Sequence, residues 1–481
     1  MTPILRLWRS AWLLPLAFLA VCGPLGIVLA VNTPPGQVPD EPAHMAKADS
    51  LLAGEVTGHR EMVDTPDGKR LQQGIDADPA LLSVAALPTP AQVNVPRLAA
   101  LAATRWTKPA FLALGTISGY WPGFYATAAA GLGVAKAAGA SPYDAFLAAR
   151  IANLALYLAI GTAALALARR GQALLFCTLA VPMALHLGAS VNQDGLTIAS
   201  SALAVALLTR PPAAAASYAR REAARIAAAA LIAAVVLAKP PYLPLAILLL
   251  LPFPPFADRR SWAGRAALML LVVACGLGWT WITVRHVTTP VLRPPVEAGP
   301  LWPGTRPAVF AGTDMAGQIR VLLEKPVRFL TLPWESIRHD DFMLDEAIGM
   351  LAWLNLALPA WLYLAWKVAL VSSTGAGLVE HREDAEALPA WQAPAPLLCA
   401  LAAVFAIYLS QYLSWTPVGN RHVEGPQGRY WLPLLPVVAF ALPSLPRLPA
   451  IGLALTVVPI AVGVADIFVL PGLIIRFFYL Q

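Results

Sequence analysis

The sequence is poor in charged residues and in cysteine. Only 13% of its 481 residues are charged, whereas soluble domains average about 25%, so the composition argues against a water-soluble globular protein. The four cysteines, Cys22, Cys177, Cys275 and Cys399, each lie inside an apolar segment and lack the spacing of metal ligands. We therefore expect them to pack as small core residues, and we predict neither a disulfide framework nor a zinc site.

Two patterns that mark other functional classes are also missing. The chain has no Gly-rich loop of the kind that binds nucleotide phosphates. No segment combines a basic run with interleaved aromatic residues, so the net charge of +7 does not indicate a nucleic-acid partner. Most of this charge is expected on the loops between membrane spans.

Long apolar runs dominate what is present. Hydrophobic residues make up 58% of the chain, and their runs are continuous rather than alternating, which argues against a membrane β-barrel. The sequence predicts an all-α fold, a single integral membrane domain over residues 1–481 that forms a polytopic bundle of transmembrane helices with about 11 spans. The candidate spans are 11–31, 145–168, 172–188, 195–209, 226–238, 243–257, 263–284, 346–366, 396–413, 430–446 and 449–470.

Basic residues in the short loops predict how the bundle is oriented. Arg6 and Arg9 precede the first span, which we interpret as an uncleaved helix with its N-terminus inside. Alternation then places the short basic connections, such as Arg169-Arg170, in the cytoplasm, as the positive-inside rule requires. The two long connections, 32–144 and 286–345, fall on the outer face.

Residues 120–138 are a test of this scheme. A full crossing here would move every later loop to the other side and place the basic clusters outside. We therefore expect a juxtamembrane or re-entrant helix that belongs to the first outer loop. An ordinary transmembrane helix is the alternative.

Polar residues remain at four places, each at the predicted outer end of a span. These are Asp40-Glu41-Pro42-Ala43-His44, Asn192-Gln193-Asp194, Lys239 with Tyr242, and Gln427-Gly428-Arg429-Tyr430. Independent placement would scatter such groups over both membrane faces. Ionisable residues kept beside membrane helices are functional candidates by default, so we predict one site at the outer surface.

Carboxylates and cations at a membrane surface suit the transfer of a sugar from a polyprenyl phosphate. A carboxylate near the anomeric carbon can accept the proton of the incoming hydroxyl, and Arg or Lys can stabilise the charge that develops on the leaving phosphate. Asp40 and Glu41 are the candidate catalytic residues. The candidate substrate-binding residues are His44, Lys47, Asn192, Asp194, Lys239, Tyr242, Gln427, Arg429 and Tyr430.

These motifs resemble a known family. Together with Lys47 and Gly54, the four polar segments are similar to the bacterial membrane family called domain of unknown function 2142, from about Leu16 to Leu442. That family is placed with the GT-C glycosyltransferases. The resemblance implies a GT-C bundle with juxtamembrane helices in the first outer loop and a site on the outer face of the bacterial cytoplasmic (inner) membrane. It also implies an inverting transfer from a polyprenyl-phosphate sugar to an envelope glycan, lipid or protein, with a carboxylate of the first outer loop as base. The resemblance favours Asp40 over Glu41, and the choice between them stays open.

Each candidate also has a structural interpretation, and both interpretations stay open. Asp40-Glu41 could cap a helix that begins at Pro42, and Asp194 could cap the helix 195–209. Lys239 could extend to the interface, and Arg429 could anchor there beside aromatic residues. His44 could be a hydrogen-bonded structural residue.

The function and the cofactor have alternatives too. A transporter or flippase of lipid-linked saccharides is the second candidate, and charges near the bilayer midplane with inverted repeats would favour it. His44 and Glu41 could bind a divalent metal or hold Asp40 in place, so no metal ligand is assigned. The sugar and the acceptor stay open.

Overall fold

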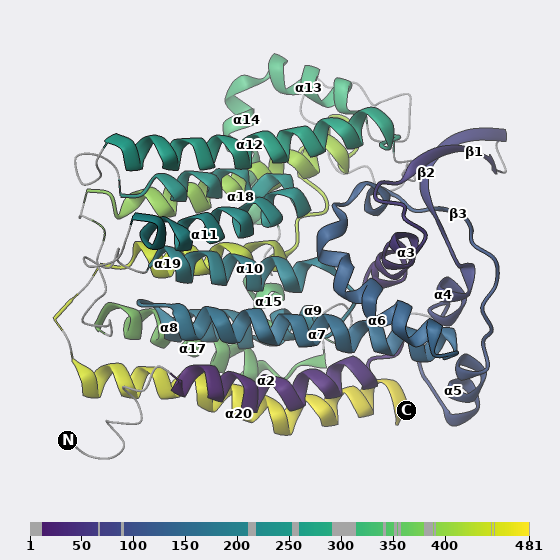
Figure 1. Ribbon diagram of the computed structural model, residues 1–481, viewed down its shortest axis with the longest axis horizontal. Helices are drawn as coiled ribbons and strands as arrows, with labels where there is room; N and C mark the ends of the chain where they lie inside the picture. Colours follow the sequence, from purple (N-terminus) through teal and green to yellow (C-terminus); the bar gives the residue numbers. More distant parts are fainter. Residues whose placement is uncertain are drawn as a thin grey trace.

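The long helices of the protein form a bundle along one common axis (Figure 1). The computed structural model describes residues 12–65, 68–87, 91–209, 218–252, 259–290, 314–339, 343–350, 354, 357–379, 388, 391–443, 445–446 and 448–480. Helix α3 (Glu41–Leu52) lies at one end of the bundle, which we call the α3 end, and helix α2 (Leu13–Asn32) begins at the opposite end.

Among the described residues, six helices are long and apolar enough to cross a membrane. They are α2, α7 (Pro142–Leu167), α12 (Arg259–His286), α17 (Ala360–Val379), α18 (Pro394–Ser414) and α20 (Pro449–Tyr479). A bent pair, α9 (Pro182–Gly188) with α10 (Gln193–Leu208), would make seven if it is one span, and the chain direction bends by 114° at the break between them. The multi-pass helical class is confirmed, whereas a number near 11 stays a prediction.

Further helical elements occupy the rest of the bundle. They are α8 (Gln172–Ala180), α11 (Tyr218–Ala238), η3 (Pro240–Leu250), η5 (Gly428–Leu434) and α19 (Leu435–Ala441). Two of them, η3 and η5, are 3₁₀ helices that contain prolines within the turn, Pro244 and Pro433. Proline removes a backbone donor and disfavours the α-helical bond pattern, which explains the tighter turns.

The expected span at 346–366 is wrong in its bounds. The structure instead has the short helix α15 (Met343–Ile348) and a long helix that begins at Ala360 and continues to Val379. Residues 372–392, which their charged side chains predict to be a polar connecting loop, are therefore helical as far as Val379. The hydroxyls of Ser372, Ser373 and Thr374 each donate to a carbonyl three or four residues earlier, so these three groups have partners within the apolar helix.

The first long loop, 32–144, carries small elements at the α3 end. Beside α3 it contains α4 (Pro79–Val84), α5 (Val95–Ala102) and two single 3₁₀ turns, η1 (Thr116–Gly119) and η2 (Pro122–Tyr125). Helix α6 (Ala126–Ala137) follows and packs against α7. With 12 residues, α6 is about 18 Å long, short of the ~30 Å hydrocarbon core, which supports the juxtamembrane interpretation of 120–138.

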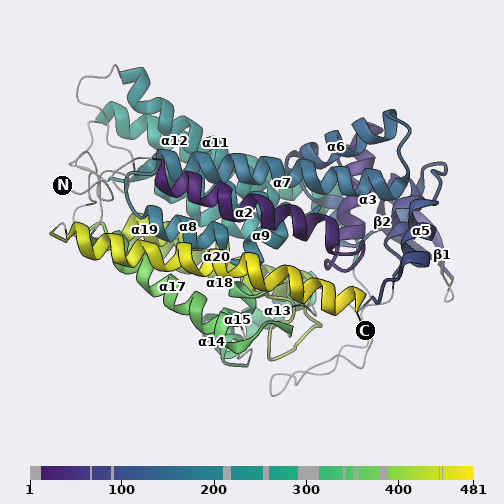
Figure 2. The same ribbon diagram turned by 90° about the horizontal axis from the view of Figure 1, so that it is seen from below.

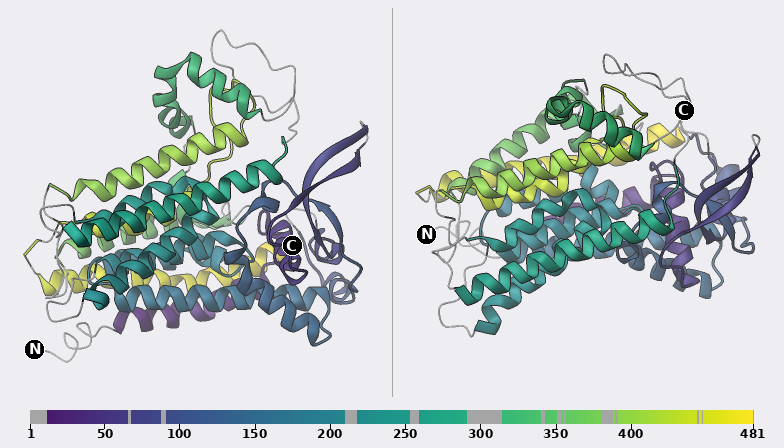
Figure 3. Two further views of the ribbon diagram at one scale, coloured as in Figure 1. Left: turned by 45° about the horizontal axis from the view of Figure 1, so that its top comes forward. Right: turned by 90° about the horizontal axis from the view of Figure 1, so that it is seen from above.

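A small antiparallel sheet in this loop was not expected from the all-α prediction. Its order is β1 (His59–Thr65), β2 (Gly68–Ala77) and β3 (Ala110–Ala113), and Figure 3 shows the β1–β2 hairpin extending away from the helices. The sequence Pro66-Asp67-Gly68 is a strong turn signal that could have predicted the hairpin.

The second long loop, 286–345, is helical where the structure describes it. Helix α13 (Met315–Glu324) and helix α14 (Pro326–His339) both pack against α18. Residues 291–313 and 340–342 of this loop lie outside the described residues.

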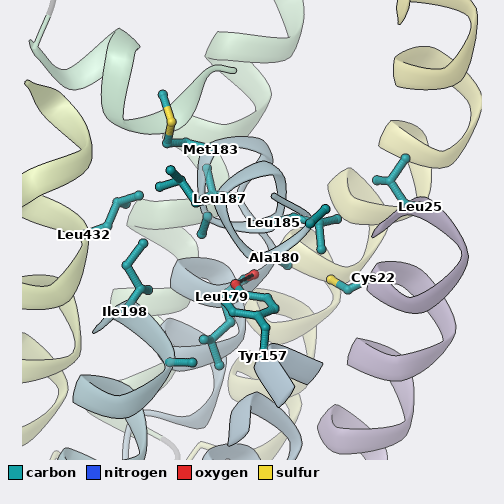
Figure 4. Packing of buried hydrophobic residues seen from close by; sticks show 14 of the residues in the cluster. Cys22, Leu25, Tyr157, Leu179, Ala180, Met183, Leu185, Leu187, Ile198 and Leu432 are labelled. Atoms are coloured by element: carbon teal, nitrogen blue, oxygen red, sulfur yellow. Dashed lines mark hydrogen bonds between the residues drawn. The ribbon is translucent and has the colours of Figure 1, made fainter. Parts of the chain in front are cut away.

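A core of buried residues forms between α2, α7 and the helices that follow α7. Figure 4 shows Cys22 and Leu25 of α2 near Tyr157 of α7 and Leu179 of α8. Helices α2 and α20 lie side by side (Figure 2), and the Tyr479 hydroxyl donates to the Asn32 carbonyl at 3.0 Å.

The cysteines divide between the core and the surface. Cys22, Cys177 and Cys399 are buried and free, as expected for core residues. Cys275 is also free but exposed on α12, so the expectation that it packs in the core is wrong. The reason is that α12 is a peripheral helix with most of its apolar surface outside the bundle.

Candidate functional site

The four polar segments meet at the α3 end of the bundle. They lie at the start of α3, at the bend between α9 and α10, at the junction of α11 with η3, and at the start of η5. The closest contacts join Asp40, Asp194, Lys239 and Arg429, which we call the charge cluster.

Asp194 holds both cations of the charge cluster. Its Oδ1 atom lies 2.5 Å from Lys239 Nζ, and its Oδ2 atom lies 3.3 Å from Arg429 Nε. The side chains of Asp194 and Arg429 are almost fully buried, and that of Lys239 is 17% exposed. A buried carboxylate between two cations is stable only because each charge has a partner, so the three groups form one unit.

Asp40 lies beside this unit with a more accessible carboxylate. Its Oδ2 atom is 3.7 Å from Arg429 Nη2, and its side chain is 58% exposed. Asp40 occupies the N-cap position of α3, yet its side chain makes no capping hydrogen bond. Its φ of 63° is the one positive value among the described residues other than glycine. Such strained backbone is found mostly at functional sites, where surrounding contacts hold it.

Glu41 is held by Arg150 and is separate from the charge cluster. Arg150 Nε donates to Glu41 Oε1 at 2.8 Å, Arg150 Nη2 donates to Oε2 at 2.5 Å, and the Val191 amide also donates to Oε1 at 2.9 Å. Arg150 Nη1 donates to the carbonyls of Ala30 and Thr33. Because both carboxylate oxygens are engaged in a buried bidentate pair, we assign Glu41 a structural role.

Arg150 is a residue that the sequence reasoning missed. It lies inside the predicted span 145–168 and is fully buried in α7. A charged residue within an apolar span needs a partner, and this rule could have led to a search for the carboxylate that meets it.

His44 faces the charge cluster and is hydrogen-bonded to a tyrosine. Its Nδ1 atom lies 2.6 Å from the Tyr125 hydroxyl, and the two rings are stacked with centroids 5.7 Å apart. Burial lowers the pKa of His44 to about 4; Asp40 and Asp194 act to raise it, and Arg429 and Lys239 act to lower it. His44 is therefore a neutral hydrogen-bonding group near pH 7. Tyr125 was not among the predicted site residues.

Lys47 does not reach the charge cluster. Its Nζ atom donates to the carbonyls of Val56 and Ser118 at 3.1 and 3.2 Å. Burial lowers the pKa of this ammonium to about 8, and Glu55 acts in the opposite direction. These contacts fix the chain after α3 to the η1 turn, so we assign Lys47 a structural role.

Asn192 and Tyr242 organise the backbone around the cluster. Asn192 caps α10, because its Oδ1 atom accepts the Asp194 amide at 2.6 Å; Asp194 itself therefore does not serve as the N-cap. The Tyr242 hydroxyl donates to the Tyr430 carbonyl at 2.8 Å and joins η3 to η5. Lys239 Nζ lies 3.9 Å from the Tyr430 ring centroid, a cation–π contact that further fixes the ammonium.

Gln427 precedes the segment that carries Arg429. It occupies the N-cap position of η5, and its Oε1 atom has no hydrogen-bond partner among the described residues. The next amide, that of Gly428, donates to Glu346 Oε2 of α15 at 2.7 Å. Contacts from α15 and from η3 thus hold the start of η5.

One group of potential metal ligands lies away from Glu41 and His44. Among the described residues, Glu55, His59 and Asp76 offer ligand atoms within 4.8 Å of one another. They lie at the sheet, where His59 Nδ1 is 2.8 Å from Glu55 Oε1 and the Asp76 amide donates to Glu55 Oε2, so hydrogen bonds account for this arrangement. Glu41 and His44 already have Arg150 and Tyr125 as partners, and this disfavours a metal held between those two.

The fold and the charge cluster define a multi-pass helical membrane protein with a polar site at one end of its bundle. The chain belongs to the family described as predicted membrane protein (DUF2142), whose match covers residues 24–438 and all four polar segments. No curated protein and no solved structure matched the chain.

Proposed function

We propose that this protein is a membrane glycosyltransferase of the GT-C type. It moves a sugar from a polyprenyl-phosphate donor to a cell-envelope acceptor, which is a glycan, a lipid or a protein, on the outer face of the bacterial inner membrane. The observation that supports this most is that the accessible Asp40 carboxylate lies next to the buried guanidinium of Arg429.

Each member of the charge cluster has a role in this reaction. Asp40 accepts the proton of the acceptor hydroxyl while the oxygen of that hydroxyl forms a bond to the anomeric carbon. The bond from that carbon to the phosphate oxygen breaks, and polyprenyl phosphate leaves with the electron pair, which inverts the configuration. Arg429 and Lys239 stabilise the phosphate charge, and Asp194 holds both cations in position before the donor arrives.

Burial supports this division of roles. Arg429 has a 5% exposed side chain, so its attraction for a phosphate is weakly screened by water. Asp40 is the exposed carboxylate of the cluster and can meet an acceptor that arrives from solution or from the membrane surface. His44 is neutral and can only position or hydrogen-bond a substrate oxygen near pH 7.

A transporter or flippase of lipid-linked saccharides is the second candidate. Two observations favour it: the charge cluster adjoins the bend of the α9–α10 pair, and Asp466 is buried in the middle of α20 with Trp366 Nε1 donating to it at 3.1 Å. Broken helices and intramembrane acids are common in transporters. The exposed base-like carboxylate at the end of the bundle favours the enzyme.

The test compares Asp40→Asn with a matched control in the same loop, Asp64→Asn. Asp64 is an exposed carboxylate on β1, away from the charge cluster. Each variant is returned to a deletion strain, and the envelope glycans are analysed by mass. We expect Asp64→Asn to restore the missing sugar and Asp40→Asn to lose it while reaching the membrane in normal amounts. Sugar transfer at the wild-type rate by Asp40→Asn would exclude Asp40 as the base.

A further inference from the structure

Two buried glutamines of this chain have opposite surroundings. Gln318 is fully buried on α13; its Nε2 atom donates to the carbonyls of Tyr412, Thr416 and Pro417, and its Oε1 atom accepts the Gly419 amide. Gln193 is 1% exposed at the first position of α10, and neither its Nε2 nor its Oε1 atom has a hydrogen-bond partner among the described residues.

This contrast calls for a physical explanation. A buried carboxamide loses its hydrogen bonds to water when the chain folds, and a native structure nearly always replaces them. Gln318 follows that rule, whereas Gln193 keeps a donor and an acceptor unused. A partner from outside the chain would satisfy both atoms.

The position of Gln193 indicates which partner this is. Its sequence neighbour is Asp194, the carboxylate that holds Lys239 and Arg429. Two further carboxamide atoms without a partner belong to residues two positions before Asp194 and two positions before Arg429. Asn192 Nδ2 lies before α10, and Gln427 Oε1 lies before η5, which packs against α10. Three uncharged polar side chains with unused hydrogen-bonding capacity thus accompany the two cations.

Carboxamides recognise a particular ligand chemistry. Each can donate and accept, as a hydroxyl group does, and none offers a charge. The cations beside them suit an anionic phosphate. A ligand that joins a hydroxyl-rich group to a phosphate would use both sets of contacts.

We propose that Gln193, together with Asn192 and Gln427, binds the hydroxyl groups of a sugar whose phosphate is held by Lys239 and Arg429. This inference rests on the proposed function and identifies the side chains that bind the sugar group of its donor. Asp40 and the cations perform the chemistry, while Gln193 determines which sugar is held.

The test uses Gln193→Met in the full-length protein, reconstituted in nanodiscs. The probes are polyprenyl phosphate without a sugar and polyprenyl phosphate that carries glucose, mannose or arabinose. Gln318→Met is the matched control, because it removes a buried carboxamide whose four hydrogen bonds are made within the chain. Binding constants and melting temperatures are measured for all three proteins.

We expect the wild type to bind one sugar-bearing probe more tightly than polyprenyl phosphate. Gln193→Met should weaken that probe roughly tenfold and leave polyprenyl phosphate within about twofold. Without ligand, its melting temperature should equal or exceed that of the wild type, because an unsatisfied amide is replaced by an apolar group of similar size. Gln318→Met should melt at a lower temperature.

Several results would overturn the inference. If Gln193→Met lowers the melting temperature as Gln318→Met does, or weakens both kinds of probe equally, the amide is structural or bonded to ordered water. A wild type that does not prefer any sugar-bearing probe over polyprenyl phosphate has the same consequence. None of these results touches the assignment of Asp40 as base. Conversely, selective binding without transfer would overturn the proposed enzyme and keep the sugar site.

Discussion

The carboxylate of Asp40 lies 3.7 Å from the guanidinium of Arg429 and connects the first long loop with the segment before α19. Neither residue belongs to one of the six long apolar helices. The contact therefore depends on how those helices pack, and it brings a solvent-accessible acid to a buried cation.

The two adjacent acids of α3 should respond differently to neutralisation. Glu41→Gln leaves Arg150 buried without its counter-charge, and removal of one partner from a buried pair costs about 3–5 kcal/mol. We expect a clearly lower melting temperature of the detergent-solubilised protein. Asp40→Asn, which changes an exposed carboxylate, should melt close to the wild type. Equal stability of the two variants would contradict the structural role of Glu41.

Two lysines provide a second matched pair. Lys239→Gln removes a cation that faces Asp194, so we expect weaker binding of polyprenyl phosphate and reduced sugar transfer. Lys47→Gln alters contacts to the carbonyls of Val56 and Ser118, which are separate from the charge cluster, and should lower stability without changing the affinity of the folded protein. Binding to nanodisc-embedded protein measures both. An affinity loss in Lys47→Gln as large as in Lys239→Gln would place Lys47 in the site after all.

Stability should depend on pH through His44. Its pKa is lowered from 6.5 to about 4 in the folded protein, so between these values the unfolded chain binds a proton that the folded chain does not. This contribution to stability is present above pH 6.5 and is lost as the pH falls toward 4, by at most about 1.4 kcal/mol per pH unit. The melting temperature of His44→Gln should therefore fall less between pH 7 and pH 5 than that of the wild type. Parallel pH profiles of the two proteins would show that His44 titrates normally.

The orientation of the bundle is open to chemical labelling. Met62 is exposed on the hairpin at the α3 end, and Leu448 is exposed where α20 begins at the opposite end. In a background without the native cysteines, an impermeant maleimide should label Met62→Cys in intact spheroplasts. Leu448→Cys should react only in inverted vesicles. The reverse labelling pattern would place the charge cluster in the cytoplasm, away from an extracytoplasmic acceptor.

The sequence predicted structure correctly where a residue type is compatible with a single environment. Continuous apolar runs without charge predict membrane helices because lipid leaves the backbone no other partner, and six such helices are present among the described residues. The same reasoning misplaced residues 372–379, because the charged residues of 372–392 predicted a loop. The helix continues to Val379, and the hydroxyls at 372–374 donate to carbonyls of that helix. The hairpin was not predicted, because its strands are not long apolar runs and only the turn residues Pro66-Asp67-Gly68 indicate it.

The candidate site shows which features the sequence predicts and which it does not. The amino-acid sequence by itself determined that Asp40, Asp194, Lys239 and Arg429 occur at helix ends, where ionisable side chains can stay near water. Only the tertiary structure decided which polar side chains meet. Asp194 pairs with both cations, Glu41 pairs with Arg150, and Lys47 donates to two carbonyls. Charge pairing acts over a few ångströms between segments far apart in the chain, and that distance is set by helix packing.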